Sequence, residues 1–540
     1  KADRPRQTPS RGATESQVFF RNRSVGLMLP ERSTSRIYRY AHRWRSHSAF
    51  VEHRQEMPIG IQLATEHDRY LTGVFTARLA CLPFSWIGGL VCYHWSKDLY
   101  GKQAATASLI MWCFSPNIQA NASQVIPDLG ATSMVIAAFY VLRNWLKVEA
   151  RRKPVVLGVV LGAALLTKFT TIVLVPIIAM VIVIGNFQKP LQRMVNTIRS
   201  VSRELFICFA IALFIINLGY FFEDTCLPFH DYEFSSESLS GIPQNENVKG
   251  NRFLTSWSAN LPIPFPRNYV LGIDLVKYEF ERGYWSYLNG TFQNKGWWYF
   301  YIYALAMKEP IGFWGLALIS TIAAIIRVAS SRLSGEEWML IGTSFTIICA
   351  VSSQTGFTHH MRYAILVLPF WYILSSRIIA ERSLAGLQIA LLVSVIASSC
   401  YSFPHQISYF NELAGGPSNG WKHLNTSNYD WGQSLNYLSK WIERNPDKQP
   451  LYVESSGAIP PQVYGIKSPS PMIQVSTDGS AFYPIGWYAI CVGEMLKVDS
   501  TVRPFLKLKP VDRVAHTVFI YHLDVPLTVG RLDSNAGVPE

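Results

Sequence analysis

Apolar residues along this chain come in blocks rather than at an even spacing. Several blocks approach the ~20 residues that a helix needs to cross a bilayer. They cover residues 72–95, 103–118, 129–147, 154–185, 204–222, 311–328, 337–355, 361–380 and 384–401. The pattern predicts a mainly α-helical, polytopic transmembrane bundle of about ten spans over residues 71–401, with a long outer loop at 223–310.

The pattern changes beyond about residue 402, where short alternating runs replace the long apolar blocks. Strand-like runs occur at 450–456, 487–493 and 517–523. The segment 432–444 has helical spacing and places four apolar residues on one face, namely Leu435, Leu438, Trp441 and Ile442. We therefore expect residues 402–540 to form a small soluble α/β domain with its own core.

Residues 1–70 are polar and contain no apolar block. They are rich in Arg and Ser near the start and show no periodicity. We expect either a disordered or surface-lying arm or an incomplete start of the protein, in which a first transmembrane helix is missing.

Composition agrees with a membrane protein, because 49% of the residues are hydrophobic and only 16% are charged. The net charge of +13 does not indicate nucleic acid binding, since the basic residues form short clusters between apolar blocks. We interpret these clusters as topology signals and contacts to lipid headgroups. The cysteines show neither metal-ligand spacing nor a disulfide framework.

Short basic loops lie on the cytoplasmic side of a membrane. This rule places the basic segments 143–154 and 188–203 inside, so the block between them must go out and return with Lys168 near its outer turn. Continuing the alternation brings all the polar candidates to one extracytoplasmic face. They are Asp128, Lys168, the loop 223–310, His359, His360, Arg362 and the C-terminal tail.

Five of these residues have side chains that suit chemistry at a membrane surface. Asp128 is either a helix N-cap or a carboxylate that binds or deprotonates a substrate hydroxyl. Lys168 and Arg362 either anchor their helices at the interface or bind a lipid phosphate. His359 and His360 can bond a phosphate or a sugar, or simply occupy the interface. Two adjacent histidines without a third ligand are weak support for zinc, and we expect no metal.

Aromatic residues crowd the end of the long loop, where Trp285 and Trp297 lie within residues 283–310. Such residues form interfacial belts in any membrane protein, but they also stack on sugar rings. In the tail, Asp430 is expected to cap the helix of 432–444, and Asn428, Asp430 or Trp431 can also contact a saccharide.

Several segments together resemble the bacterial membrane glycosyltransferases of family 39, which include protein O-mannosyltransferases and lipid A aminoarabinose transferases. The segments occur in order from about residue 68 onward. They are "SPNIQANASQVIPDLGAT", "LGAALLTKFT", "RGYWSYLNGTFQNKGWWYFYIYALAMKEP", "THHMRYAILVLPF" and "YFNELAGGPSNGWKHLNTSNYDWGQSL". The chain differs from the family in having Asn121 where relatives commonly have a histidine, and in lacking an acidic pair in a first outer loop.

The resemblance implies a GT-C fold and an enzyme that moves a sugar from a polyprenyl phosphate to an acceptor, with inversion. It implies an integral protein of the bacterial inner membrane with a periplasmic active site and no cofactor. Lys168 and Arg362 would hold the donor phosphate with help from His359 and His360, and Asp128 would orient or activate the acceptor. The residues that would contact the sugar or acceptor are Tyr363, Trp285, Trp297, Asp430 and Trp431.

Two other functions fit the same composition. A transporter or flippase of lipid-linked sugars should show internal repeats and charges near the membrane midplane, and neither is evident. An inactive glycan-binding membrane protein would explain the missing acidic pair. The identity of the sugar, and whether the acceptor is a protein, a lipid or a glycan, are left open by the sequence.

Overall fold

The structure is a computed structural model that describes most residues of the chain. Those residues are 56–66, 70–147, 153–187, 194–243, 249–329, 333–357, 359–381, 384–455, 457, 459–469, 472–475, 480–497 and 500–531. The chain divides into two compact units, residues 1–66 and 67–540. The first unit contains helix α2 (Glu56–Glu66), and the rest of the predicted N-terminal arm lies almost entirely outside the described residues.

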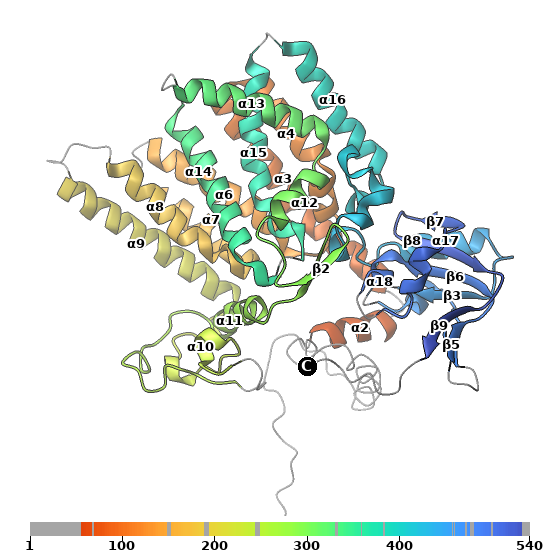
Figure 1. Ribbon diagram of the computed structural model, residues 1–540. Coiled ribbons are helices and arrows are strands. Elements are labelled where there is room, and N and C mark those ends of the chain that lie inside the picture. Colours follow the sequence, from red (N-terminus) through yellow and green to blue (C-terminus); the bar gives the residue numbers. More distant parts are fainter. Residues whose placement is uncertain are drawn as a thin grey trace, which may run out of the picture. The chain divides into compact units, whose positions relative to one another are not determined.

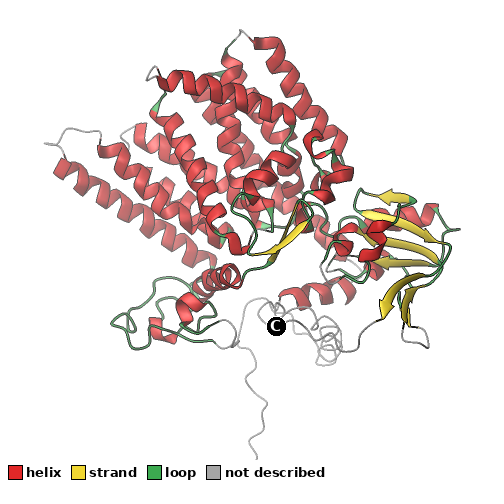
Figure 2. Ribbon diagram, viewed as in Figure 1, coloured by secondary structure: helices red, strands yellow, loops and turns green. Residues whose placement is uncertain are grey.

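Helices make up most of the second unit (Figures 1 and 2). Its first half contains α3 (Tyr70–Tyr100), α4 (Lys102–Phe114), α5 (Pro116–Ala122), α6 (Pro127–Lys147), α7 (Lys153–Thr167), α8 (Leu174–Phe187) and α9 (Met194–Gly219). Helix α3 packs against both α4 and α6, and all three helices contact α15 (Leu368–Ser376). Large side chains such as Trp95, Trp112 and Phe139 are fully buried between them, so the core of the unit lies inside this helical layer.

Two small residues allow α7 and α9 to approach closely. Gly158 and Gly162 are four residues apart and therefore lie on one face of α7. A Cβ atom at Gly158 would lie 2.6 Å from the carbonyl oxygen of Cys208, and one at Gly162 would lie 2.7 Å from Cβ of Ile215. Helices in membranes commonly pack through such pairs of small residues.

The second half contains α12 (Phe300–Lys308), α13 (Ile311–Ala329), α14 (Gly335–Ser353), α15 and α16 (Ala385–Ser402). Helices α12 and α13 are bent by 115° at Glu309 and Pro310. Proline cannot donate the backbone bond that would continue α12, and it keeps Glu309 extended, with φ −91° and ψ 145°. The predicted outer loop 223–310 therefore ends in a helix rather than in irregular chain.

Five helices are long and apolar enough to cross a membrane, and the bent pair of α12 and α13 would make six. This count covers only the described residues. The predicted block at 154–185 does form two short apolar helices with a break at Lys168. The mainly α-helical membrane architecture is confirmed, whereas the ten-span topology stays a prediction.

The segment between α9 and α12 packs through α11 (Arg267–Arg282) and a hairpin of β1 (Trp285–Leu288) and β2 (Thr291–Asn294). Two acidic residues of α11 hold the chain around the short α10 (Glu237–Ser240). Asp274 accepts hydrogen bonds from the backbone of Ser235 and Ser236, and Glu281 accepts one from the backbone of Glu237. Carboxylates in such positions satisfy amides at the start of a helix.

The strands of the C-terminal part form two small sheets (Figure 2). Their order is β3-β6-β8-β7 in one and β4-β5-β9 in the other. The elements are β3 (Leu451–Glu454), β4 (Gln474–Val475), β5 (Ser480–Tyr483), β6 (Gly486–Cys491), α18 (Val492–Met495), β7 (Asp512–Val514), β8 (Val518–Leu523), β9 (Leu527–Arg531) and α17 (Leu435–Arg444). The three predicted strands correspond to β3, β6 and β8. Leu435 and Leu438 of α17 are buried against them, as the helical spacing predicted.

A buried ionic network joins the ends of α6, α14 and α15. Arg143 lies 2.6 Å from Asp98 and 2.5 Å from Glu336, and Arg377 pairs with Glu337. Arg143 lies fifteen residues after Asp128 on α6, which is about 22 Å along a helix. This network therefore lies at the end of the helical layer opposite Asp128.

Candidate active site

Asp128, Lys168 and Arg362 form a buried ionic triad. Lys168 Nζ lies 2.5 Å from Asp128 Oδ1, and Arg362 Nε lies 3.5 Å from Asp128 Oδ2. The Asp128 side chain is only 3% exposed, so the carboxylate depends on these two cations for stabilisation. Two positive charges and one negative charge leave the triad with a net charge of +1. This excess favours an anionic ligand beside it.

Local sequence explains how each member of the triad reaches this position. Asp128 lies in the first turn of α6, which begins at Pro127, so the alternative of an N-cap outside the helix is not what the structure shows. Lys168 is extended between α7 and the next helical turn, and its carbonyl accepts the Thr171 hydroxyl at 2.6 Å. Arg362 lies on a short 3-10 turn, Met361–Tyr363.

Aromatic rings cover both cations. Lys168 Nζ lies 4.1 Å from the ring centre of Tyr363, and the Arg362 guanidinium carbon lies 4.3 Å from the ring centre of Trp431. Such cation–π contacts hold a charge while leaving its remaining hydrogen-bond donors available. Arg362 Nη1 has no hydrogen-bond partner among the described residues. The triad therefore offers a guanidinium donor to a ligand.

His359 and His360 precede the triad and are held by residues of the C-terminal part. His360 Nδ1 lies 2.6 Å from the hydroxyl of Ser427. The Asn428 amide donates to the carbonyl of His359 at 2.6 Å and accepts from the backbone N–H of Met361 at 2.7 Å. Burial lowers the pKa of His359 to about 4 and lowers the pKa of His360 well below its usual value. Both rings are therefore neutral at pH 7 and can serve a phosphate as hydrogen-bond partners, not as cations.

These shifts predict that the protein loses stability in mild acid. Both rings are neutral in the folded and unfolded states above about pH 6.5, so their contribution is complete there. It falls as the pH drops from 6.5 towards 4, because the unfolded histidines bind protons that the folded ones, beside Lys168 and Arg362, resist. We expect His359 alone to account for a loss on the order of 1–2 kcal/mol at pH 5, with a further loss in the same direction from His360, measured as a lower melting temperature.

His359→Gln should weaken this pH dependence, since glutamine does not titrate. His522→Gln, which changes an exposed side chain on β8, is the matched control and should retain the wild-type dependence. Equal pH dependence in wild type and His359→Gln would contradict the assignment of the acid sensitivity to this site.

Lys308 at the end of α12 organises the wall beside the triad. It is 3% exposed, and its Nζ donates to three backbone carbonyls, at 2.8 Å to Ile407, 3.1 Å to Tyr409 and 2.6 Å to Asn428. The three protons of the ammonium group are thus all used within the protein. Lys308 fixes the chain that carries Asn428, and Asn428 fixes the backbone on both sides of His360.

The neighbouring Glu309 is fully buried and anchors the same region to α5. Its carboxylate accepts hydrogen bonds from Asn117 at 2.8 Å and from Tyr372 at 3.1 Å. Asn117 also donates to the carbonyl of Lys308. The bend between α12 and α13 thus connects α5, α15 and the C-terminal part at one point.

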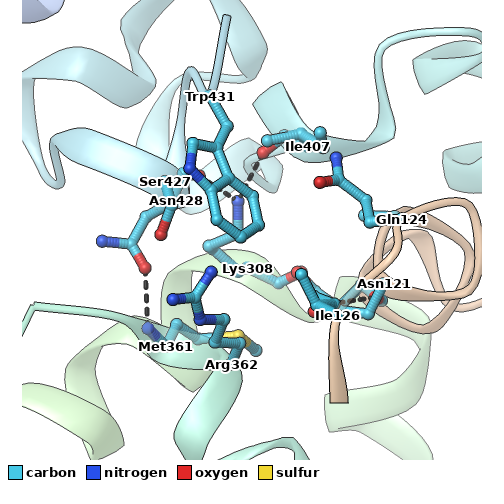
Figure 3. Close-up of a pocket in the computed structure, with 12 residues that line it drawn as sticks. Asn121, Gln124, Ile126, Lys308, Met361, Arg362, Ile407, Ser427, Asn428 and Trp431 are labelled. Carbon is cyan, nitrogen blue, oxygen red and sulfur yellow. Dashed lines mark hydrogen bonds between the residues drawn. The ribbon is translucent and has the colours of Figure 1, made fainter. Parts of the chain in front are cut away.

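A small cavity, partly open to solvent, lies beside Arg362 (Figure 3). Its wall comes from α5 and the residues after it, from α12, from the turn of Arg362 and from the C-terminal part. The wall residues are Asn117, Ala120, Asn121, Gln124, Ile126, Lys308, Met361, Arg362, Ile407, Ser427, Asn428 and Trp431. Figure 3 shows Arg362 and Trp431 on one side and Asn121, Gln124 and Ile126 on the other.

Trp285, Trp297 and Asp430, which were also predicted as site residues, are not among the residues that line this cavity. Trp285 is exposed on β1, and Trp297 is partly buried against the main core. The prediction that Asp430 caps the helix of 432–444 is wrong, because α17 begins at Leu435. Asp430 instead accepts the backbone N–H of Gly432 at 2.9 Å, and its burial raises its pKa.

Sequence reasoning missed Lys308 and Glu309, and it considered Asn428 only as a possible contact to a saccharide. A buried lysine followed by an acidic residue and a proline was a signal at 308–310, but the carbonyls that Lys308 binds belong to a segment about a hundred residues away. Among the described residues, no group of three His, Cys, Asp or Glu side chains is arranged to hold a metal ion.

Part of the chain is similar in sequence to a known protein family. Residues 71–218 match the family described as dolichyl-phosphate-mannose-protein mannosyltransferase. No match was found among curated protein sequences. A similar solved structure is ArnT from Cupriavidus metallidurans bound to undecaprenyl phosphate, with 11% identity over 90% of this chain and 88% of that chain and a TM-score of 0.41.

The apo state of ArnT from Cupriavidus metallidurans is similar at 10% identity, covers 82% of each chain and has a TM-score of 0.26. At these TM-scores no residue is transferred from ArnT to this chain. The family match thus covers Asp128 and Lys168, while Arg362 lies outside the matched residues 71–218.

Proposed function

We propose that this protein is a membrane glycosyltransferase of the GT-C type that takes a sugar from a polyprenyl-phosphate donor and attaches it to an acceptor with inversion. The ionic triad carries this proposal, because a net positive, partly buried site between apolar helices and a cavity suits a lipid-linked phosphate. The family match of residues 71–218 supports it. We place the reaction on the periplasmic side of a bacterial inner membrane.

In the proposed reaction the acceptor hydroxyl attacks the anomeric carbon from the face opposite the phosphate. The bond between the anomeric carbon and the phosphate oxygen breaks, and its electron pair leaves with the polyprenyl phosphate. The acceptor proton passes to a base. Negative charge grows on the phosphate as the bond breaks, so preorganised cations at that oxygen lower the barrier.

The residues take the following roles in this proposal. Lys168 supplies a point charge and Arg362 a planar donor to the phosphate. Neutral His359 and His360 add hydrogen bonds. Asp128 holds both cations through its two oxygens, and this geometry supports an orienting role more directly than a proton-accepting one.

Tyr363 and Trp431 shield the two cations from water, which strengthens their attraction for the phosphate. Trp285, Trp297 and Asp430 have no role at the triad in this proposal. Trp285 is an exposed aromatic side chain on the β1–β2 hairpin and can meet the membrane surface or the acceptor.

A transfer assay tests the function. The full chain, purified in detergent, is incubated with a radiolabelled polyprenyl-phosphate sugar and a panel of peptide, lipid and glycan acceptors. We expect label to move to one acceptor class, with or without a chelator, since the proposal uses no metal. If the donor lipid instead moves from one leaflet to the other in proteoliposomes and no sugar is transferred, the protein is a flippase. If the donor binds but is neither moved nor used for transfer, the protein is a glycan-binding protein.

Arg362→Ala should raise the KM for the donor by about 100-fold, because a charge-assisted pair with phosphate contributes about 1.5–3 kcal/mol. Arg362→Lys should restore only part of the affinity, since lysine lacks the planar fork. Arg444→Ala, an exposed arginine in the last turn of α17, is the matched control and should leave the KM unchanged. A wild-type KM in Arg362→Ala would contradict the phosphate assignment.

A further inference from the structure

The reaction proposed above needs a group that takes up the proton of the acceptor hydroxyl. Asp128 is poorly suited, because Lys168 lies 2.5 Å from its Oδ1 and Arg362 lies 3.5 Å from its Oδ2. A proton added to this carboxylate would break both ion pairs and leave two cations facing each other. The described residues that line the cavity beside Arg362 include no aspartate or glutamate. The geometry thus favours a proton acceptor that is not a carboxylate.

A serine and a histidine beside the triad form such a group. Ser427 is partly exposed and lines the small cavity together with Arg362 and Trp431 (Figure 3). Its Oγ lies 2.6 Å from Nδ1 of His360. A proton can pass between two atoms at this distance without movement of either side chain. Ser427 thus lines the cavity, and His360 is one hydrogen bond away from it.

The residue after Ser427 holds the pair in place. The Asn428 amide donates to the carbonyl of His359 at 2.6 Å and accepts from the backbone N–H of Met361 at 2.7 Å, so the chain is fixed on both sides of His360. The carbonyl of Asn428 in turn accepts from Lys308 Nζ at 2.6 Å. A general base needs such fixed positioning within hydrogen-bond reach of its partner.

The charges around His360 connect its basicity to the leaving phosphate. The charged and titratable groups near its ring are Lys168, Arg362 and His359, and Tyr363 packs edge-on against it with the ring centres 5.7 Å apart. The two cations oppose a positive charge on the ring. A phosphate at the triad offsets them, and the second negative charge that it gains as the sugar leaves attracts an imidazolium. His360 thus becomes a stronger base as the transfer proceeds.

We propose that Ser427 and His360 form a relay that takes up the proton of the acceptor hydroxyl. The relay rests on the function proposed above and supplies its base. As the acceptor oxygen bonds to the anomeric carbon, its proton passes to Ser427 Oγ, and the proton of Ser427 passes to His360 Nδ1. The bond between the anomeric carbon and the phosphate oxygen breaks, and its electron pair leaves with polyprenyl phosphate. The phosphate thereby gains one negative charge, the ring gains one positive charge, and solvent later takes the proton from the ring.

Steady-state transfer by the detergent-purified full chain tests the relay, with turnover normalised to folded protein. Ser427→Ala and His360→Gln should each lower kcat by about 100-fold, as the loss of a positioned base does. Both variants should bind bare polyprenyl phosphate nearly as wild type does, because Lys168 and Arg362 are unchanged. Ser427→Thr keeps the hydroxyl and should retain most of the turnover.

Two further measurements distinguish a relay from a structural role. The pH profile of kcat/KM should have an acid limb in wild type and none in His360→Gln. The double variant should be no slower than the slower single variant, since both residues serve one step. Ser439→Ala is the matched control, because it removes a hydroxyl that donates to the carbonyl of Tyr464 at 2.9 Å within the C-terminal part. It should keep the wild-type turnover.

The outcomes separate the relay from the proposed function. If wild type transfers sugar to no acceptor, the proposed function fails and the relay fails with it. If wild type transfers sugar but Ser427→Ala keeps its turnover, or the losses of the two variants add, the relay is overturned and the function stands. Weaker binding of the bare lipid with an unchanged kcat would show a structural role and would also overturn the relay. If His360→Gln does not fold, the comparison of Ser427→Ala with Ser427→Thr decides.

Discussion

Replacing Asp128 by asparagine is expected to lower kcat/KM for sugar transfer by about 100-fold or more. Asparagine keeps the shape of the side chain but removes the charge that holds Lys168 at 2.5 Å and Arg362 at 3.5 Å. The two cations would then repel each other in a partly buried site, and their alignment on the phosphate would be lost. Transfer from a radiolabelled donor, normalised to folded protein, measures the effect.

The pH profile of the residual activity separates the two roles of Asp128. A general base contributes an acid limb to the pH dependence of kcat/KM. If Asp128 takes the proton of the acceptor hydroxyl, the pH profile of Asp128→Asn has no acid limb. If Asp128 orients the cations, as its geometry supports, the limb remains and only the level of activity falls.

Glu337→Gln is the matched control, since it also breaks a buried pair between a carboxylate and an arginine. Glu337 is 4% exposed and pairs with Arg377 at the other end of the helical layer. The variant should lose thermal stability, because removing one partner leaves a buried charge uncompensated. It should nevertheless keep its turnover per folded molecule. Equal losses of turnover in Asp128→Asn and Glu337→Gln would mean that the triad acts only through stability.

The three residues of the triad could be predicted from the sequence. Charge bias between apolar blocks placed Asp128, Lys168 and Arg362 on one face, although they are up to 234 residues apart, and the structure brings their side chains together. The three residues could be identified because charged residues are rare in the apolar blocks. A single charge in such a block has few partners available, so charges on the same face are expected to pair. The same rule predicted the break of the helix at Lys168.

Side chains that act through contacts to the backbone could not be predicted in this way. Lys308 was hidden because its partners are carbonyls, which every residue carries and no pattern marks. Asp430 was misplaced because four residues separate it from Leu435, the first residue of α17, and a turn that Asp430 forms with Gly432 occupies part of this interval. Helix starts are set by such local turns, and composition alone does not distinguish a cap from a turn.

The long apolar blocks form helices and the three predicted strands are present, whereas the chain before Pro310 differs from its prediction. Residues 300–308 read as an aromatic loop because Tyr and Trp are common at interfaces. They form α12 because Phe300, Tyr301, Ala304 and Leu305 are all buried, so packing outweighs the interfacial composition. At this bend Lys308 contacts the backbone of the C-terminal part.

Lys308→Met is expected to lower the free energy of unfolding by about 3 kcal/mol and to raise the KM for the donor by about tenfold. Methionine fills similar space, but it leaves the carbonyls of Ile407, Tyr409 and Asn428 buried without a donor. The loosened Asn428 would no longer fix the backbone beside Arg362, so donor binding weakens more than the chemical step. Thermal melting and steady-state kinetics measure the two effects separately.

Two further variants make this result specific to the contacts of Lys308. Lys422→Met lies in the same C-terminal segment but alters an exposed side chain, so it should change the melting temperature and the KM little. Lys308→Arg keeps the charge but replaces a compact ammonium by a planar fork, so it should restore stability only in part. A fully stable Lys308→Met with a wild-type KM would show that the three carbonyls find other partners. In that case Ser427, Asn428 and Trp431 of the C-terminal part would hold the turn of Arg362 without the support of Lys308.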